Sequence, residues 1–177
     1  MQLVDTNWYV VTGGPGSGKT KTIEYLAFLG YSTVSEAARK LVDLEMSKGK
    51  TVEEVRRNEK RFQRKVLAMK VDVEEKIPPG QITFFDRGIP DSLAYYRLSN
   101  MDEAEVVNAS KRKYKGVFFL DSLPYEKDYA RIEDEKTAKK LHQLLYTAYT
   151  RFGYKVIKVP VMPIDKRAKF ILSKISK

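Results

Sequence analysis

The stretch WYVVTGGPGSGKTKTIEYLA, residues 8–27, decides the fold. It opens with an apolar β-type run at 8–12, passes through a glycine-rich segment at 13–20, and ends in a helical pattern of apolar residues. The glycine-rich segment GGPGSGKT fits the pattern G-x-x-x-x-G-K-[ST], whose fixed positions here are Gly13, Gly18, Lys19 and Thr20. A strand before this pattern and a helix after it form the context of a phosphate-binding loop.

Glycines give this segment its chemistry, because backbone N–H groups surround phosphate oxygens only where side chains leave room. Lys19 is expected to reach the β and γ phosphates of a nucleotide, Thr20 to bind Mg²⁺, and the helix N-terminus to add partial positive charge. An ordinary glycine-rich turn would not need Lys-Thr at this offset. The predicted nucleotide-binding residues are Gly13, Gly14, Pro15, Gly16, Ser17, Gly18, Lys19 and Thr20.

Apolar β-type runs recur along the chain and alternate with helical patterns. This alternation is typical of an α/β fold in which a parallel sheet lies between layers of helices, and we predict a three-layer α/β/α P-loop domain. The length of 177 residues favours one domain over 1–177. The five predicted strands are 8–12, 31–34, 82–85, 117–120 and 154–159.

Local signals predict where several helices begin and end. Thr51 and Glu54 form a capping box, and Asp91 and Asp165 are candidate caps. A helix is expected over 134–152, with His142 at the boundary of its apolar stripe rather than in a catalytic role. Glycines that should end helices are Gly30, Gly49 and Gly153.

Composition limits the metal chemistry and the location. The chain has no cysteine and one histidine, so a metal must be held by oxygen atoms, which favours a hard ion such as Mg²⁺. No apolar run approaches the roughly 18 residues of a membrane span, and the N-terminus lacks the pattern of an export signal. We therefore expect a cytoplasmic protein.

The net charge of +10 is spread over helix faces, and its densest run of cations is EEVRRNEKRFQRK, residues 53–65. Cations in this run surround an apolar stripe of helical spacing, so a solvated helix face is the favoured interpretation. Contact with a nucleic acid, an anionic lipid surface or another protein is the less favoured one. The stripe consists of Val52, Val55, Phe62, Val66, Met69 and Val73.

The segment FFDRGIPD, residues 84–91, places an acid and a base directly after a buried strand. Ligands of a parallel sheet collect at the carboxyl ends of its strands, so Asp86 is expected to face the magnesium site. Arg87 is expected to stabilise charge on the transferred phosphoryl group or to hold an acceptor. A structural Asp–Arg pair is the alternative, and Asp91 is either a helix cap or an acceptor ligand.

Two further segments carry candidate residues. Glu36 and Arg39 follow the second strand, where Glu36 could accept a proton from an attacking hydroxyl and Arg39 could hold the acceptor. The alternative is a surface ion pair between them. Residues 122–133 are the least periodic part of the chain and are the candidate lid, in which Lys127 and Arg131 could close over the phosphates.

The motifs GGPGSGKT, SEAAR, FFDRGIPDSLAYYR and GYKVIKVPVMPIDKRAKFIL together resemble a family of small ATPases or kinases of the P-loop class, related to the nicotinamide riboside kinase domain of a bacterial NAD regulator. The resemblance covers nearly the whole chain. It implies the sheet order 2-3-1-4-5, Glu36 as the catalytic base, Asp86 and Arg87 as an acid–arginine pair, and Arg131 as a lid arginine. Deoxynucleoside kinases usually read Glu-Arg-Ser where this chain has Asp86-Arg87-Gly88, so the acceptor stays open.

The leading hypothesis is a kinase that uses Mg²⁺ and ATP or GTP to phosphorylate a small acceptor, preferably nucleoside-like. The second is a nucleotide-dependent regulatory module that engages a protein, an anionic lipid or RNA. A small GTPase is disfavoured because N-K-x-D and D-x-x-G are absent. Hydrolysis that drives a remodelling machine is disfavoured because the chain lacks the length for an extra domain.

Overall fold

The computed structural model describes residues 3–122 and 134–175. Its central sheet contains five parallel strands in the order β3-β4-β2-β6-β7. Counted along the chain, this order is 2-3-1-4-5, as the resemblance implied. The five strands are β2 (Trp8–Gly13), β3 (Ser32–Val34), β4 (Thr83–Asp86), β6 (Gly116–Leu120) and β7 (Val156–Val159).

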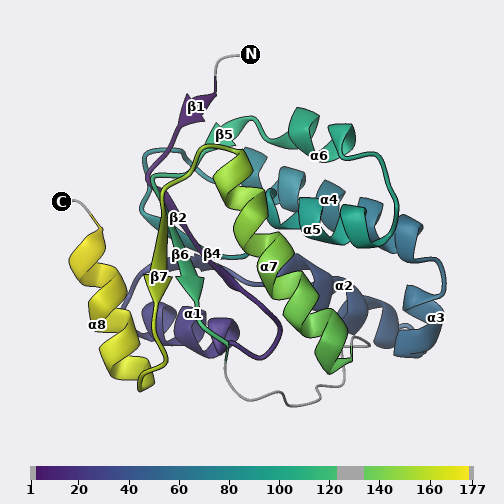
Figure 1. Cartoon of the computed structure of the whole chain (residues 1–177), viewed down its shortest axis with the longest axis horizontal. Helices are drawn as coiled ribbons and strands as arrows, with labels where there is room; N and C mark the ends of the chain where they lie inside the picture. Colours follow the sequence, from purple (N-terminus) through teal and green to yellow (C-terminus); the bar gives the residue numbers. More distant parts are fainter. Residues whose placement is uncertain (1–2, 123–133, 176–177) are drawn as a thin grey trace.

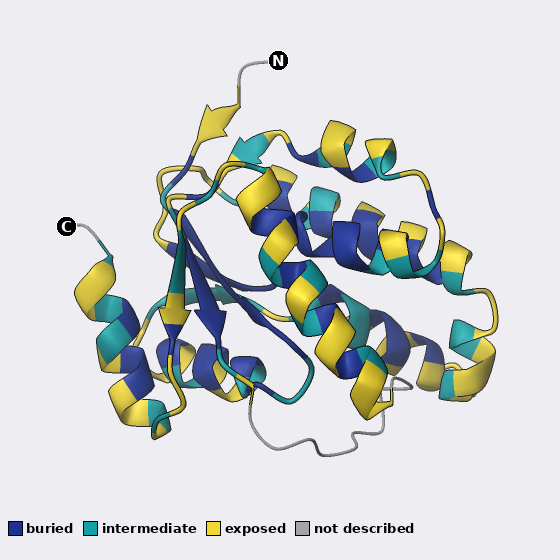
Figure 2. Cartoon of the chain, in the orientation of Figure 1, coloured by how far each residue is buried: buried dark blue, intermediate teal, exposed yellow. Residues whose placement is uncertain are grey.

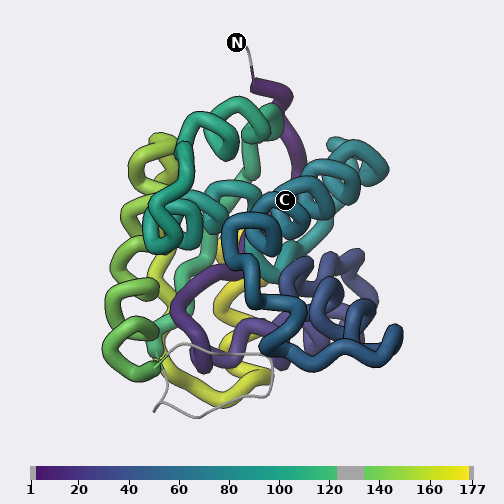
Figure 3. The backbone as a smooth tube through the Cα atoms, turned by 90° about the vertical axis from the view of Figure 1, so that its right-hand side faces the viewer, coloured from purple at the N-terminus to yellow at the C-terminus, as the bar shows by residue number. Residues whose placement is uncertain are grey.

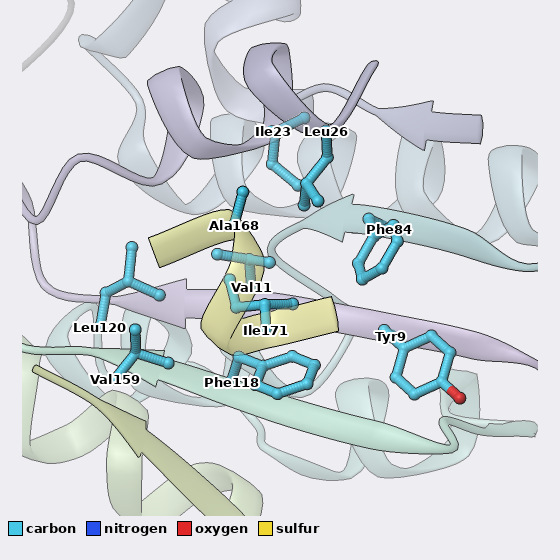
Figure 4. Close-up of a cluster of buried hydrophobic side chains, with 10 residues drawn as sticks. All are labelled: Tyr9, Val11, Ile23, Leu26, Phe84, Phe118, Leu120, Val159, Ala168 and Ile171. Atoms are coloured by element: carbon cyan, nitrogen blue, oxygen red, sulfur yellow. The ribbon is translucent and has the colours of Figure 1, made fainter. Parts of the chain in front are cut away.

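Helices cover both faces of this sheet, which gives the predicted three layers (Figure 1). On one face, α1 (Lys19–Phe28) packs beside α8 (Ile164–Lys174). Alternate residues of β2 define the two faces, since Tyr9 and Val11 join the core under α1 and α8 (Figure 4). The other members of that core are Ile23, Leu26, Phe84, Phe118, Leu120, Val159, Ala168 and Ile171.

The opposite face of the sheet is covered mainly by α7 (Glu135–Arg151), which lies across it in Figure 1. Trp8 and Val10 of β2 pack there against Tyr149 of α7. The strands β2, β4 and β6 are almost entirely buried between the layers, as the dark blue arrows in Figure 2 show. The functional groups must therefore lie at the strand ends rather than on the sheet faces.

Five helices, from α2 to α6, gather on the side of the molecule that faces the viewer in Figure 3, and α4 reaches the sheet, since its Val73 packs with Trp8 and Phe85. The apolar residues of α2 pack against those of α4. Near the N-terminus, β1 (Val4–Asp5) and β5 (Arg112–Lys113) form a separate two-stranded parallel sheet that the sequence did not predict. The five helices are α2 (Ala37–Met46), α3 (Val52–Arg56), α4 (Glu59–Lys76), α5 (Asp91–Leu98) and α6 (Ala104–Ala109).

The helix-terminus predictions are confirmed in part. The Thr51–Glu54 capping box is present at α3, and the three glycines end their helices at φ values of 90°, 89° and 78°. Asp91 and Asp165 are not caps, because the N-caps of α5 and α8 are Pro90 and Pro163. The stripe from 52 to 73 is divided between two helices, since the Asn58 side chain accepts from the Arg61 amide and begins a new helix there.

The predicted lid at 122–133, with Lys127 and Arg131, lies outside the described residues except for its first residue. Within 3–122 and 134–175, no helix has both the length and the apolar character that a membrane crossing needs.

Candidate active site

The phosphate-binding loop runs from Gly13 at the end of β2 to Thr20 in the first turn of α1. Gly13 has a φ of 141°, and a Cβ atom there would lie 2.6 Å from the Leu120 carbonyl oxygen. No other residue type would fit without moving the β6 backbone. The loop is thus folded tightly against the neighbouring strand, which fixes its position at the carboxyl edge of the sheet.

Two cations orient the peptide groups of this loop. Lys19 Nζ donates to the Gly14 carbonyl at 2.7 Å and to Ser17 Oγ at 3.3 Å. The buried Arg167 of α8 donates to the carbonyl oxygens of Ser17 at 3.4 Å and Gly18 at 3.3 Å. Since the N–H of a trans peptide points opposite to its carbonyl, these contacts direct the amides of Gly18 and Lys19 to the other side, where phosphate oxygens would lie.

His142 of α7 also contacts the loop. Its Nδ1 accepts from the Gly14 amide at 3.1 Å and lies 3.0 Å from Ser122 Oγ. Burial is the main cause that lowers the pKa of His142, and the nearby Lys19 adds to it. The neutral imidazole can accept the amide hydrogen, so His142 braces the loop. It was predicted as a boundary residue, and no motif in the sequence indicated this contact with the loop.

Thr20 and Asp86 meet beside the loop, as predicted for a metal site. Thr20 Oγ1 donates to Asp86 Oδ2 at 2.9 Å. The other carboxylate oxygen of Asp86, Oδ1, is buried and accepts no hydrogen bond from the described residues. Burial, followed by the nearby Glu36 carboxylate, raises the pKa of Asp86 to about 6. An unsatisfied buried carboxylate oxygen next to a hydroxyl fits an oxygen-ligand cation site.

Arg87 connects the loop to the acids around it. Its Nε donates to Glu36 Oε1 at 3.0 Å, and its Nη1 donates to the Gly13 carbonyl and to Asp91 Oδ1, both at 3.2 Å. The residue is 6% exposed. Asp86 and Arg87 are neighbours in sequence, but their side chains bind different groups. Asp86 contacts Thr20, while Arg87 pairs with Glu36, the residue before α2, and with Asp91 of α5.

Glu36 lies at the start of α2, after β3. Burial works against its charged form, but the cations Arg87, Lys19 and Arg39 outweigh burial and hold its pKa below the ordinary value. Glu36 thus pairs mainly with Arg87 rather than forming only a surface pair with Arg39. An ionised carboxylate at this position can accept a proton from a hydroxyl group.

Asp91 is fully buried and is saturated with hydrogen bonds. Its Oδ2 accepts from the Gly88 amide at 2.8 Å and from the Tyr149 hydroxyl, and its Oδ1 accepts from Thr12 and Arg87. This carboxylate holds the turn after β4 and does not face a pocket.

A pocket opens directly beside the phosphate-binding loop, between α2, α3 and α4. Its wall is apolar at Phe62 and Val66 and polar at Gln63, whose Nε2 donates to Glu59 at 2.8 Å. Arg56 also binds Glu59, with Nη2–Oε1 at 2.7 Å, and its guanidinium lies 4.8 Å above the Phe62 ring. The pocket is lined by Pro15, Glu36, Ala38, Arg39, Val42, Arg56, Phe62, Gln63, Val66, Lys70, Arg87 and Tyr95.

Several of these pocket residues were not predicted from the sequence. Arg56 was assigned to a solvated face, but its side chain is only 9% exposed. Gln63 and Lys70 lie on the buried face of α4, at positions adjoining the apolar stripe. The sequence did hold one indication of their burial: a glutamine and a lysine, seven residues apart, occur at helical spacing beside apolar residues. Arg167 had a similar signal, four residues before the buried Ile171.

Comparison with known proteins places this loop and sheet in a family. A family model described as AAA domain matches residues 8–167. The chain belongs to this family. No curated protein matches the sequence of this AAA-domain chain.

Solved structures share the fold of this AAA-domain chain at low sequence identity. Deoxyadenosine kinase from M. mycoides is 15% identical with a TM-score of 0.66, and the match covers 94% of this chain and 97% of the kinase. Thymidylate kinase from Candida albicans is 13% identical with a TM-score of 0.66, covering 98% and 92%. The NadR protein in complex with NR is 16% identical with a TM-score of 0.71, but this chain, covered to 95%, spans only 49% of NadR. The fold is that of P-loop nucleoside and nucleotide kinases.

Proposed function

We propose that the chain is a Mg²⁺-dependent phosphotransferase that moves the γ-phosphoryl group of ATP or GTP to a small, nucleoside-like acceptor. The observation that carries this proposal is the pocket beside Pro15, which Glu36 and Arg87 line. A donor phosphate on the loop and a hydroxyl group in the pocket would meet at these two side chains. Positioning of the reactants and neutralisation of charge provide most of the catalysis in phosphoryl transfer. We propose the cytoplasm, where nucleotides are available, as its location.

Each catalytic residue has a role in this proposal. Lys19 and the loop amides bind the donor phosphates. Glu36, whose pKa lies below its ordinary value because cations outweigh its burial, accepts the proton of the acceptor hydroxyl. Arg87 stabilises the charge that spreads over the transferred group. Arg131, from the predicted lid, is proposed to join it there, and Lys127 to help close the site.

Thr20 and Asp86 would hold the magnesium ion, which supplies positive charge to the phosphate oxygens when it is bound. The buried Oδ1 of Asp86, which no group of residues 3–122 and 134–175 hydrogen-bonds, supports this assignment. Within the described part of the chain, no cluster of three or more histidine or acidic residues could form a cage for a metal. Mg²⁺ does not need such a cage, because it usually keeps waters and phosphate oxygens as ligands beside one or two protein groups.

The pocket suits a flat, partly polar acceptor. Phe62 and Tyr95 supply aromatic surface, and the buried Gln63 supplies an amide. Arg39 lines the same pocket and is proposed to hold the acceptor, whereas Asp91 is too buried to do so. Neighbouring structures support a nucleoside-like acceptor, since they include a deoxyadenosine kinase with bound dATP and NadR in complex with NR.

The decisive experiment is a ³¹P assay of phosphoryl transfer with Mg-ATP and Mg-GTP. The acceptor panel contains nucleosides, nucleoside monophosphates and nicotinamide riboside. We expect turnover with one class of acceptor, and we expect Glu36→Gln to lower it by at least about a hundredfold. Transfer by this variant within a few-fold of wild type would contradict the role of Glu36 as base.

A second candidate function is a nucleotide-dependent regulatory module that binds an anionic lipid, RNA or a protein. The exposed cations on α4 and the segment before it favour this candidate: Arg57, Lys60, Arg61 and Lys65. Binding to RNA or anionic vesicles that changes between the diphosphate and triphosphate states, with no acceptor consumed, would support it over the kinase.

A further inference from the structure

The turn that carries Arg87 has an unusual backbone. Arg87 has a φ of 70°, in the left-handed region. For a residue with a Cβ atom, this conformation costs about 1–2 kcal/mol and persists only where the surrounding structure holds it. The contacts that hold the turn therefore also determine where the guanidinium lies.

Two hydroxyl groups from distant segments hold the amide side of this turn. The Gly88 amide donates to the Tyr149 hydroxyl at 3.1 Å, in addition to its bond to Asp91. The next amide, that of Ile89, donates to the Tyr114 hydroxyl at 3.0 Å. All of these groups are buried, so water is not available to replace a lost partner.

Lys70 holds the carbonyl side. This residue of α4 is 7% exposed, and its Nζ donates to the Gly88 carbonyl at 2.8 Å and to Ser92 Oγ at 3.1 Å. Among the described residues, the hydrogen-bond acceptors of this ammonium group are neutral, and the nearby carboxylates Asp91, Glu36 and Glu74 offset only part of the cost of burial, which lowers the pKa of Lys70 to about 8.

Gly88 itself fits between the two tyrosines. A Cβ atom at this position would lie 2.7 Å from the Tyr114 hydroxyl and 2.9 Å from the Tyr149 hydroxyl. The hydroxyl groups thus occupy the space of a side chain and bind the backbone in its place. The peptide groups on either side of Gly88 are fixed, one by Tyr149 and the other by Lys70.

We propose that Lys70 and Tyr149 are positioning residues for phosphoryl transfer, because they fix the two peptide groups that flank Gly88 and so hold the Arg87 guanidinium between the phosphate-binding loop and Glu36. The inference rests on the role given to Arg87 in the proposed function. Tyr149 does not line the pocket proposed for the acceptor, and Lys70, which does line it, acts in this inference through its bond to the Gly88 carbonyl rather than through contact with the acceptor. A shift of the turn would move Arg87 away from the Gly13 carbonyl and Glu36, which it now contacts at 3.2 Å and 3.0 Å.

The test compares Lys70→Met and Tyr149→Phe with the control Tyr96→Phe. Tyr96 is also fully buried, and Tyr96→Phe loses one hydrogen bond, to Glu105, that is remote from the turn, whereas Tyr149→Phe loses its bonds with the Gly88 amide and with Asp91. We expect each of the two test variants to lower kcat by at least about tenfold with KM for the nucleotide within about twofold of wild type. The control should keep both constants. An unchanged kcat in both test variants of an active enzyme would overturn the proposal.

A second readout does not depend on turnover. In ¹H–¹⁵N spectra, the Nε–H signal of Arg87, identified by its absence in Arg87→Lys, should exchange slowly with solvent in wild type. Its exchange should accelerate by at least about tenfold in Lys70→Met and in Tyr149→Phe, but not in the control. Retained protection in both variants contradicts the positioning role. Failure of the wild type to phosphorylate any acceptor would instead contradict the proposed function.

Discussion

Replacement of Arg87 by lysine keeps the positive charge and removes the planar guanidinium. In the wild-type chain, Nε contacts Glu36 at 3.0 Å, while Nη1 contacts Asp91 and the Gly13 carbonyl at 3.2 Å. An ammonium group is a single point of charge, so it cannot bind both carboxylates in this geometry. Hydrogen bonds to charged groups contribute about 1.5–3 kcal/mol each, and two of the three are lost if the ammonium keeps one, so we expect the free energy of unfolding to fall by about 3–6 kcal/mol.

The assay is urea unfolding at pH 7, with an unchanged m-value as the sign that the change is one of stability. Arg97→Lys is the matched control, because Arg97 also makes two hydrogen bonds to a carboxylate, at 2.8 Å and 3.1 Å to Glu103. Its side chain is 42% exposed, so the same substitution should cost less than about 1 kcal/mol. Equal losses in the two variants would refute the argument that burial makes Arg87 important.

Three further predictions concern the loop, a buried acid and the turn. Lys19→Ala should raise the dissociation constant for Mg-ATP by about a hundredfold in calorimetric titrations. An unchanged affinity would rule out phosphate binding by Lys19 and its loop. Burial raises the pKa of Glu74 to about 7, above its value of 4.5 in an unfolded chain, so between these values the folded chain keeps a proton that the unfolded chain releases. The free energy of unfolding therefore falls as the pH rises between these two values, and the fall ends once the pH has passed about 7. Glu74→Gln should therefore remove about 2 kcal/mol of the fall in unfolding free energy between pH 5 and pH 8, and an identical fall in both proteins would contradict it. Gly88→Ala should destabilise the fold by about 2 kcal/mol, whereas Gly80→Ala, whose Cβ meets nothing within 4 Å, should change it by less than about 0.5 kcal/mol in the same urea assay.

Local pattern was sufficient for the sheet and for the position of the site. The runs around Trp8, Phe84 and Phe118 are β-type and apolar because both faces of the sheet are covered, and each became a strand. The carboxyl ends of parallel strands lie at one edge of the sheet, so the sequence alone predicts that Asp86 lies near Thr20. The hydrogen bond between them confirms that proximity.

The buried polar contacts could not be predicted in the same way, because their partners come from distant parts of the chain. Lys70 binds a carbonyl 18 residues away, and the Tyr114 hydroxyl donates to Glu74, 40 residues before it. Helical spacing indicates that such a residue faces the interior, but it does not identify what lies opposite. The break before α4 was also missed, because the spacing of seven between Val55 and Phe62 fits one continuous helix as well as two.

The close fit of Gly88 between two phenol hydroxyls also limits how this family can diverge. A serine at 88 would collide with both rings' oxygen atoms unless the residues at 114 and 149 became smaller or moved. Changes at these three positions should therefore be inherited together. Relatives with a side chain at 88 should lack at least one of the tyrosines. Such covariation would show in which relatives the turn after the acid–arginine motif is held by groups other than the two tyrosine hydroxyls.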